Sequence, residues 1–263
     1  MSIRPISSRD NPHYKLLRQL ATSAPARKKA GQTLLDGIHL CAAWLEHRGA
    51  PQMCIVSDSA QTHAEVIAVL DACQLLGISV LLLPDALFAP LSQVENGIGL
   101  LFVVDTPTAS GEPVLHGAAL LLDGVQDPGN LGSMLRTAAA AGMVQVYCGS
   151  STVNAWSPKV LRAGMGAHFA LDITENIDLH TLIEAASVPV FATSSHAQVS
   201  LYDLDLRLPC AWLFGNEGRG VSETLLALCS QRLSIPQHPA VESLNVAASA
   251  AICLFEQVRQ QRS

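Results

Sequence analysis

The stretch LLLDGVQDPGNLGSMLRTAAAAG, residues 120–142, joins an apolar run to a polar loop and then to a segment with an apolar stripe. The apolar run is typical of a strand that is buried on both faces. Asp127 followed by Pro128 predicts a helix start, with the aspartate as N-cap, although Asn130 could also cap the helix. Gly142 predicts where that helix ends. The stretch therefore predicts a strand, a loop and a helix, which is the repeating unit of α/β proteins.

Short apolar strands alternate with helical segments along almost the whole chain of 263 residues. Strands that are apolar on both faces and separated by helices predict parallel sheets covered on both sides. The segment DTPTASGEPVLHG, residues 105–117, interrupts the alternation because it is polar and rich in Pro, Gly, Ser and Thr. We therefore expect two α/β domains, residues 1–105 and 117–263, joined by a linker over residues 106–116.

The composition predicts a well-packed protein, with 49% hydrophobic and 14% charged residues. No apolar run reaches the length of a membrane span, and the first residues lack the apolar core of a signal peptide. The seven cysteines are odd in number and include no C-x-x-C pair, and no two of the nine histidines follow H-x-x-x-H spacing. We therefore expect reduced thiols, no metal site, no membrane partner and a cytoplasmic location.

Basic residues gather at the start of a chain whose net charge is −6. Seven of the sixteen Lys and Arg residues lie in the first 29 residues, against one acid, Asp10. Such a face can bind phosphates whatever the total charge, because screening limits the reach of each charge to about 10 Å. A solvated helix face is the alternative. The candidate nucleic-acid contacts are Arg9, Lys15, Arg18, Arg27, Lys28 and Lys29.

A second loop, LFGNEGRGVS at residues 213–222, places three glycines between a predicted strand and a predicted helix. Glycines in this position indicate a tight turn or the close approach of another group. The loop does not read G-x-G-x-x-G, and in the segment GVQDPGN Asn130 stands where a P-loop has lysine. Together with Glu217, these absences favour a ligand without phosphates, which could be cationic.

The third loop, IPQHPAVESLNVAASAAI at residues 235–252, precedes a helix predicted over residues 243–261, with Ser243 as its N-cap. On the earlier helix, Arg136 lies off the apolar stripe, and its side chain leans toward the helix N-terminus. A cation is unfavourable there unless an anionic or oxygen-rich ligand binds. Arg136 is therefore a candidate ligand contact, with an exposed helix arginine as the alternative.

These three loops, in this order, resemble the three motifs of the SpoU/TrmH family of RNA ribose methyltransferases, in the SPOUT superfamily. The stretch SPKVLRAGMGAHFALDI, residues 157–173, also resembles this family, so that the likeness covers about residues 117–263. The opening SRDNPHYKLLRQL, from residue 8, is similar to a small α/β RNA-binding domain, resembling a ribosomal protein, that many members carry. The resemblance implies a C-terminal α/β domain tied into a trefoil knot, and a homodimer. It also implies S-adenosylmethionine as cofactor and methyl transfer to a ribose 2′-hydroxyl of RNA. Ribosomal RNA is favoured over transfer RNA because the extra domain adds a contact surface.

The resemblance also implies site residues. Arg136 matches the catalytic arginine, which is expected to contact the RNA ribose and to stabilise negative charge on its hydroxyl, since a guanidinium keeps its proton above about pH 12. Asn130, Glu217, Ser243 and Asn245 match the other catalytic motif positions. The cofactor is expected to lie against Gly215, Asn216, Gly218, Ile235, Gln237, Ser243, Leu244 and Asn245.

The third motif departs from the family pattern at two positions. Gln237 stands where methionine is usual, and Pro239, which has no backbone N–H, stands where glycine is usual. This departure motivates one alternative, a knotted RNA-binding protein with weakened or lost cofactor binding. The glycine loops motivate another, a Rossmann-like nucleotide enzyme, which the missing G-x-G-x-x-G opposes.

Overall fold

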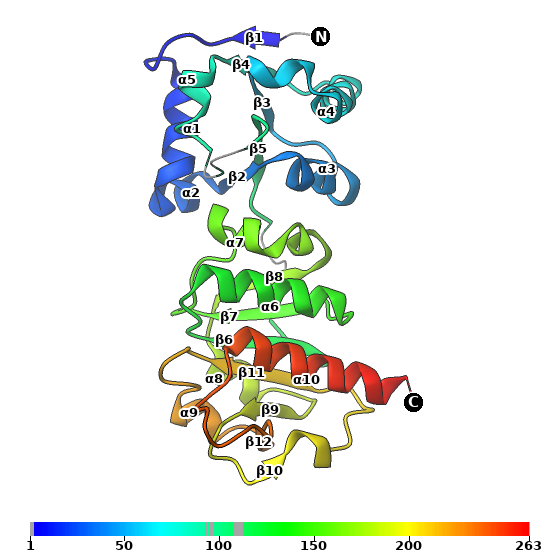
Figure 1. Ribbon diagram of the computed structural model, residues 1–263. Helices are drawn as coiled ribbons and strands as arrows, with labels where there is room; N and C mark the ends of the chain where they lie inside the picture. Colours follow the sequence, from blue (N-terminus) through cyan, green and yellow to red (C-terminus); the bar gives the residue numbers. More distant parts are fainter. Residues whose placement is uncertain (1–2, 93, 95–96, 108–112, 263) are drawn as a thin grey trace. The chain divides into compact units, whose positions relative to one another are not determined.

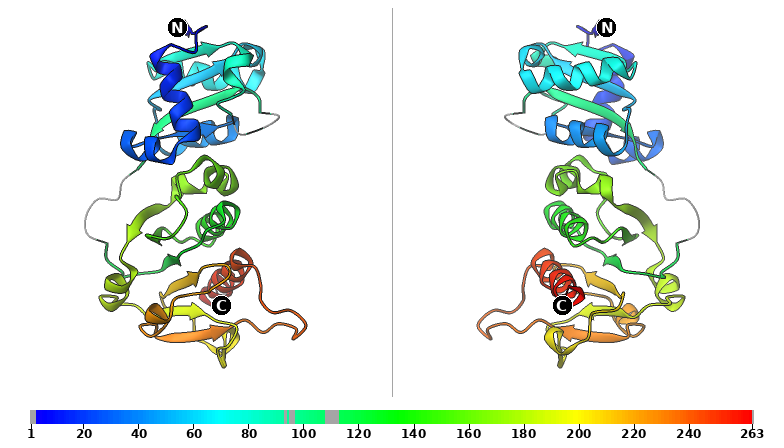
Figure 2. Two further views of the ribbon diagram at one scale, coloured as in Figure 1. Left: turned by 90° about the vertical axis from the view of Figure 1, so that its left-hand side faces the viewer. Right: turned by 90° about the vertical axis from the view of Figure 1, so that its right-hand side faces the viewer.

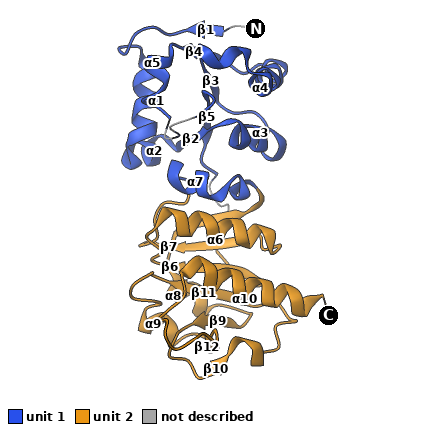
Figure 3. Ribbon diagram, viewed as in Figure 1, with its two compact units in different colours: residues 1–107, 156–169 blue, residues 108–155, 170–263 orange. Residues whose placement is uncertain are grey.

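The computed structural model describes residues 3–92, 94, 97–107 and 113–262. The chain forms two compact units, shown in different colours in Figure 3. The first comprises residues 1–107 with 156–169, and the second comprises residues 108–155 with 170–263. The change of unit near residue 107 falls in the predicted linker, of which residues 108–112 lie outside the described residues. The segment 156–169 belongs to the first unit, although the linear division of the sequence placed it in the second domain.

The first unit contains a five-stranded sheet in the order β1-β4-β3-β5-β2. Its strands are β1 (Ile3–Pro5), β2 (Gln32–Asp36), β3 (Met53–Ser57), β4 (Val80–Leu83) and β5 (Leu100–Asp105). β1, β4 and β3 are parallel, whereas β5 runs antiparallel to both β3 and β2. The prediction of a parallel sheet is wrong for this unit, because two apolar faces indicate that a strand is buried but not in which direction it runs.

Helices cover both faces of this sheet, with α1, α2 and α5 on one side and α3 and α4 on the other (Figure 1). They are α1 (Pro12–Thr22), α2 (Ala24–Ala30), α3 (Ile38–His47), α4 (Ala64–Leu75), α5 (Asp85–Phe88) and α7 (Pro158–Gly164), with 3₁₀ turns η1 (Ser59–Thr62) and η2 (Ala167–Ala170). α1 begins where Asn11 accepts a hydrogen bond from the backbone of His13, and Pro12 occupies its first turn. Tyr14 and Leu17 of α1 are buried against the sheet. α1 is therefore fixed by its apolar side, and its other side faces outward.

The second unit contains a seven-stranded parallel sheet in the order β10-β12-β9-β11-β6-β7-β8. Its strands are β6 (Ala119–Asp123), β7 (Gln145–Gly149), β8 (Asp172–Ile177), β9 (Val190–Thr193), β10 (Val199–Ser200), β11 (Ala211–Gly215) and β12 (Gln231–Ser234). Its helices are α6 (Pro128–Ala140), α8 (Leu179–Glu184), α9 (Glu223–Leu226) and α10 (Val246–Gln261), with the 3₁₀ turn η3 (Leu201–Asp203). The prediction of a parallel sheet is confirmed here.

Both faces of this second sheet are apolar and covered. Leu121 and Leu213 pack in a buried cluster with residues of α8 and α9. On α10, Gln257 accepts a hydrogen bond from the indole of Trp212, at 2.8 Å. α10 also packs against α6, beside which it lies in Figure 1. The loop that leads from β12 to α10 stands away from the rest of the unit in Figure 2. The knot itself stays a prediction.

No described helix is long and apolar enough to cross a membrane. Among the described residues, no group of three or more His, Cys, Asp or Glu side chains is placed to hold a metal ion. All seven cysteines are free thiols, and six of them are buried.

Candidate active site

The candidate site lies where two neighbouring strands of the second unit end. Asp123 at the end of β6 is paired with Gly215 at the end of β11. Along the chain, β6, β7 and β8 extend the sheet in one direction, whereas β9 and β11 lie on the other side of β6. Ligands of open α/β sheets bind outside the carboxyl ends of strands where the order reverses in this way. The first two motifs therefore meet at the expected place.

Glu217, in the glycine-rich loop after β11, closes the N-terminus of α6. Its carboxylate accepts hydrogen bonds from the backbone N–H groups of Gln126, at 3.1 Å, and Asp127, at 2.9 Å. Asp127 is the N-cap of α6 and accepts a bond from the backbone of Asn130 at 2.8 Å, as predicted. Since a helix N-terminus favours a negative charge, Glu217 holds the glycine-rich loop against the start of α6.

A chain of side-chain hydrogen bonds joins the three motifs. Asn130 donates its amide N–H to Glu217 at 3.1 Å, and Asn245 donates its own to the amide oxygen of Asn130 at 2.9 Å. An ionised carboxylate can only accept, so Asn130 must turn its NH₂ toward Glu217 and its oxygen toward Asn245. The Asn245 oxygen then accepts from the backbone N–H groups of Ala247 and Ala248. The carboxylate of Glu217 thus sets the orientation of the Asn130 amide, which in turn sets that of the Asn245 amide.

Hydrogen bonding lowers the pKa of Glu217. Partial burial of the carboxylate acts to raise this pKa, but the bonds from the Asn130 side chain and from the backbone of Asp127 and Gln126 outweigh it. The side chain is therefore ionised at neutral pH, which the direction of the hydrogen-bond chain requires. Glu217 thus holds the loop and orients Asn130. The sequence left the role of Glu217 open between orientation on the RNA side and loop structure.

The glycine-rich loop folds back on itself. Asn216 and Gly220 exchange two backbone hydrogen bonds, at 3.0 and 2.8 Å. The Asn216 side chain accepts from the backbone of Gly218 and Arg219, and donates to the carbonyl of Gly124 at 2.9 Å. A side chain at Gly215 would come within 2.1 Å of the backbone between Gly220 and Val221. The glycines predicted the close approach of another group. At Gly215 that group is the backbone of the same loop.

The predicted N-cap of α10 is wrong by two residues. Asn245 caps the helix, which begins at Val246, and Ser243 is exposed and makes no side-chain hydrogen bond to the described residues. Ser243 and Asn245 are both good capping residues, and the bond from Asn245 to Asn130 decides between them. Ser243 remains available to a ligand, and so does the half-buried Leu244, whose backbone bonds to none of the described residues.

Gln237 stabilises the loop before α10. Its side chain donates to the backbone carbonyls of Val241, at 3.3 Å, and Glu242, at 3.1 Å. His238 accepts from the backbone of Ala240 across Pro239, so that the departure from the family motif forms a compact turn. Ile235, directly after β12, is half-buried.

Two arginines of the site have side chains that bond to none of the described residues. Arg136 is exposed on α6, and Arg219 is exposed at the tip of the glycine-rich loop, next to Glu217. The sequence gave Arg136 a role from its position off the apolar stripe, but gave no role to Arg219, the guanidinium in the glycine-rich loop. It also missed Asp123, whose carboxylate accepts from the backbone of Ser222 at 2.9 Å and fastens the far end of the loop. A carboxylate at the end of a buried strand was the available signal.

The predicted nucleic-acid contacts lie in the first unit and differ in their surroundings. Arg27 donates to the carbonyl of Leu20 at 2.9 Å, and burial lowers its pKa, so this side chain serves the junction of α1 and α2. Lys28 and Lys29 are exposed in the last turn of α2. The other three, Arg9, Lys15 and Arg18, line a cavity beside α1.

The residues present fit a cofactor without phosphates. The Ser243–Leu244 backbone offers hydrogen-bonding groups that bond to none of the described residues, and Asn245 connects this segment to the glycine-rich loop through Asn130. No lysine stands at the start of α6, where Glu217 already supplies the negative charge. A phosphate there would be repelled, whereas a sulfonium cation would not.

The model of the SpoU rRNA methylase family matches residues 117–255. The chain belongs to this family. It is 34% identical to a tRNA/rRNA methyltransferase of Synechocystis, over 98% of this chain and 95% of that protein. It is 31% identical to the 23S rRNA (guanosine(2553)-2′-O)-methyltransferase RlmP of Bacillus subtilis, over 96% of this chain and 98% of that protein. The structure matches an AdoMet-bound rRNA methyltransferase from Sinorhizobium meliloti with a TM-score of 0.85 and 26% identity, over 99% of each chain. Membership of the SpoU family explains why three distant motifs share one hydrogen-bond chain.

Proposed function

We propose that this protein transfers a methyl group from S-adenosylmethionine to a ribose 2′-hydroxyl of ribosomal RNA. The observation that carries the proposal is the chain from Glu217 through Asn130 to Asn245, which assembles the three SpoU motifs at the ends of β6 and β11. Relatives that align over nearly the whole chain are named as rRNA or tRNA methyltransferases, and a solved relative binds AdoMet.

The two kinds of site residue have different tasks. Glu217, Asn130 and Asn245 are positioning residues, since their polar groups are used in bonds to one another and to backbone. Gly215 and Asn216 shape the glycine-rich loop, while Gly218, Ile235, Ser243 and Leu244 form the candidate wall of the cofactor site. The sulfonium of the cofactor supplies an electrophilic methyl group.

Arg136 is the candidate catalytic residue. Its guanidinium is exposed and makes no bond to the described part of the chain, so its donors are available to an RNA ribose. Because a guanidinium does not give up its proton at neutral pH, Arg136 acts by donating to the 2′-oxygen and stabilising the negative charge that develops there.

The Arg136→Ala variant tests this role. We expect it to bind S-adenosylmethionine with unchanged affinity in a calorimetric titration and to lose at least about 100-fold in methyl transfer to ribosomal RNA, the usual effect of removing a group that stabilises an oxyanion. The matched control is Arg207→Ala, which removes an exposed arginine that pairs with Asp205. Retained turnover in Arg136→Ala would remove this residue from the mechanism.

The same titration tests the alternative, an RNA-binding protein without cofactor. The turn built by Gln237 closes the loop with its own bonds and leaves Ser243 and Leu244 free, which favours the enzyme. Absence of S-adenosylmethionine binding by the folded wild-type protein would favour the alternative.

We further propose that the protein is a homodimer located in the cytoplasm, as its family resemblance implies. Light scattering of the purified chain gives the oligomeric state directly. Phe255 on α10 is 48% exposed and supplies an apolar contact for a second copy.

A further inference from the structure

A cavity of about 580 Å³ opens beside α1 in the first unit. Its volume lies in the range of small-molecule sites and far exceeds that of a phosphate group alone. It is lined by Arg9, Tyr14, Lys15, Arg18, Gln19 and Pro90. The sequence predicted a basic face here but gave no indication of a cavity, because Pro90 comes from a distant part of the chain.

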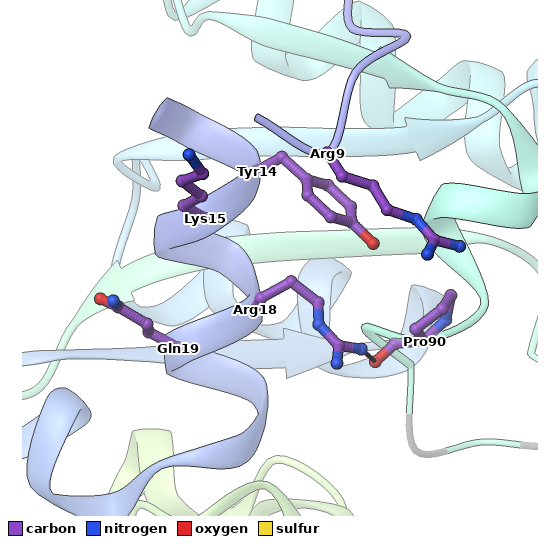
Figure 4. A pocket seen from close by; sticks show the side chains of 6 residues that line it. All are labelled: Arg9, Tyr14, Lys15, Arg18, Gln19 and Pro90. Carbon is purple, nitrogen blue, oxygen red and sulfur yellow. Dashed lines mark hydrogen bonds between the residues drawn. The ribbon is translucent and has the colours of Figure 1, made fainter. Parts of the chain in front are cut away.

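Three hydrogen-bond donors gather in this cavity (Figure 4). The guanidinium groups of Arg9 and Arg18 lie on the same side of α1 as the hydroxyl of Tyr14, whereas the ends of Lys15 and Gln19 point to the other side. Arg18 donates one N–H to the carbonyl of Pro90 at 3.1 Å, which fixes its direction and leaves further donors of its fork free. The ring of Tyr14 is buried, and its hydroxyl makes no bond to the described residues.

The guanidinium groups of Arg9 and Arg18 are not balanced by any carboxylate among the residues that line the cavity. Among the residues that line it, none is acidic, and Asp10 pairs with Lys15 at 3.0 Å. Arg9 has no ion-pair partner in the described part of the chain. Two guanidinium groups that share a cavity repel each other, and a bound anion removes that repulsion.

We propose that this cavity binds one unpaired nucleotide of an RNA strand. Arg9 and Arg18 hold its backbone phosphate, Tyr14 donates to the same group, and Pro90 offers an apolar wall to the base. A paired nucleotide cannot enter because its base is stacked in a duplex, so the ligand is a single-stranded loop or end. The proposal rests on the proposed function only in taking RNA as the class of ligand.

The test is the binding of fluorescently labelled hexauridylate to the full-length protein, followed by anisotropy at several salt concentrations. We expect Arg9→Gln to weaken binding about tenfold and to lower the salt slope by about 0.7, the value of one phosphate contact on a single strand. Tyr14→Phe should weaken binding about two- to fivefold with an unchanged slope, because it removes a neutral donor and keeps the packed ring.

The matched control is Arg48→Gln, which removes one positive charge next to α3, on the opposite face of the same sheet. It should leave the affinity within about twofold of the wild type. Equal losses in Arg9→Gln and Arg48→Gln would show a general charge effect and overturn the proposal. So would the failure of wild-type protein to bind hexauridylate.

A competition arm separates RNA from free nucleotides. Uridine monophosphate at the concentration of hexauridylate phosphate should leave the anisotropy unchanged, and full displacement would assign the cavity to free nucleotides instead. Methyl transfer to ribosomal RNA is measured separately on the same preparations. An inactive wild type that still binds hexauridylate through Arg9 would refute the proposed function but not the cavity. If the wild type is active but Arg9→Gln binds hexauridylate as tightly as the wild type does, the cavity proposal is refuted and the proposed function is not.

Discussion

At the scale of single residues, Gly215 and Gly218 lie three positions apart and differ in the room around them. A methyl group at Gly215 would stand 2.1 Å from backbone atoms of Gly220 and Val221, whereas at Gly218 the nearest contact is 3.7 Å away. We therefore expect Gly215→Ala to cost about 1–3 kcal/mol of unfolding free energy, as overpacking does, and to weaken S-adenosylmethionine binding. Gly218→Ala should change the stability by less than about 0.5 kcal/mol. Urea unfolding and calorimetry measure both, and equal effects would contradict the geometry.

The contribution of Glu217 to the free energy of unfolding depends on pH. Its pKa is lower in the folded protein than in the unfolded chain, so its contribution to stability is present above the unfolded value of about 4.3 and is lost as the pH falls through the folded value. We expect Glu217→Gln to be about 1 kcal/mol less stable than wild type at pH 7, a value reduced by solvent screening of this exposed group. The difference should shrink below about pH 4.3. The control is Glu242→Gln, an exposed glutamate in the loop before α10 whose carboxylate bonds to none of the described residues, which should change the stability at pH 7 by less than about 0.5 kcal/mol.

At the scale of elements, Asn245 serves two structures at once, as the cap of α10 and as the donor to Asn130. Asn245→Asp separates these tasks, because an aspartate caps a helix as well as asparagine but cannot donate. We expect Asn245→Asp to keep most of the stability and to lose methyl transfer, and Asn245→Ala to lose about 1 kcal/mol as well. Ser243→Ala should leave the free energy of unfolding unchanged. A loss of stability comparable to that of Asn245→Ala would mean that Ser243 is the N-cap of α10.

The same elements show what the sequence can predict. The start of α6 is specified by Asp127 and Pro128, whose effects are contained in a stretch of four residues. It was therefore predictable from the sequence. The beginning of α10 was not, because the choice between Ser243 and Asn245 depends on Asn130, more than a hundred residues away. The three motifs could be read from the order of their residues, whereas the bond from Glu217 to the start of α6 depends on β6 and β11 being neighbours.

At the scale of the whole molecule, the chain does not divide at its linker alone. Residues 156–169 are part of the first unit, where α7 packs against β2 and Phe169 meets Trp44 edge to face at 5.3 Å. Apolar periodicity predicts that a segment is buried but not which sheet buries it. The predicted domain boundaries at residues 105 and 117 divide the chain into consecutive segments, so they cannot describe a unit that is made of two separate stretches of sequence.

Thr33 offers a test of this discontinuous unit. It is fully buried on β2 and donates its hydroxyl to the carbonyl of Trp156 at 2.8 Å, which fastens the segment 156–169 to the sheet. Thr33→Val keeps the shape and leaves that carbonyl without its donor, so we expect a loss of about 1–3 kcal/mol in urea unfolding of the full chain. Thr22→Val, at an exposed hydroxyl on α1, should cost less than about 0.5 kcal/mol. Hydrogen exchange should locate the added opening of Thr33→Val in residues 156–169, and exchange that rises elsewhere instead would mean that this segment is held without Thr33.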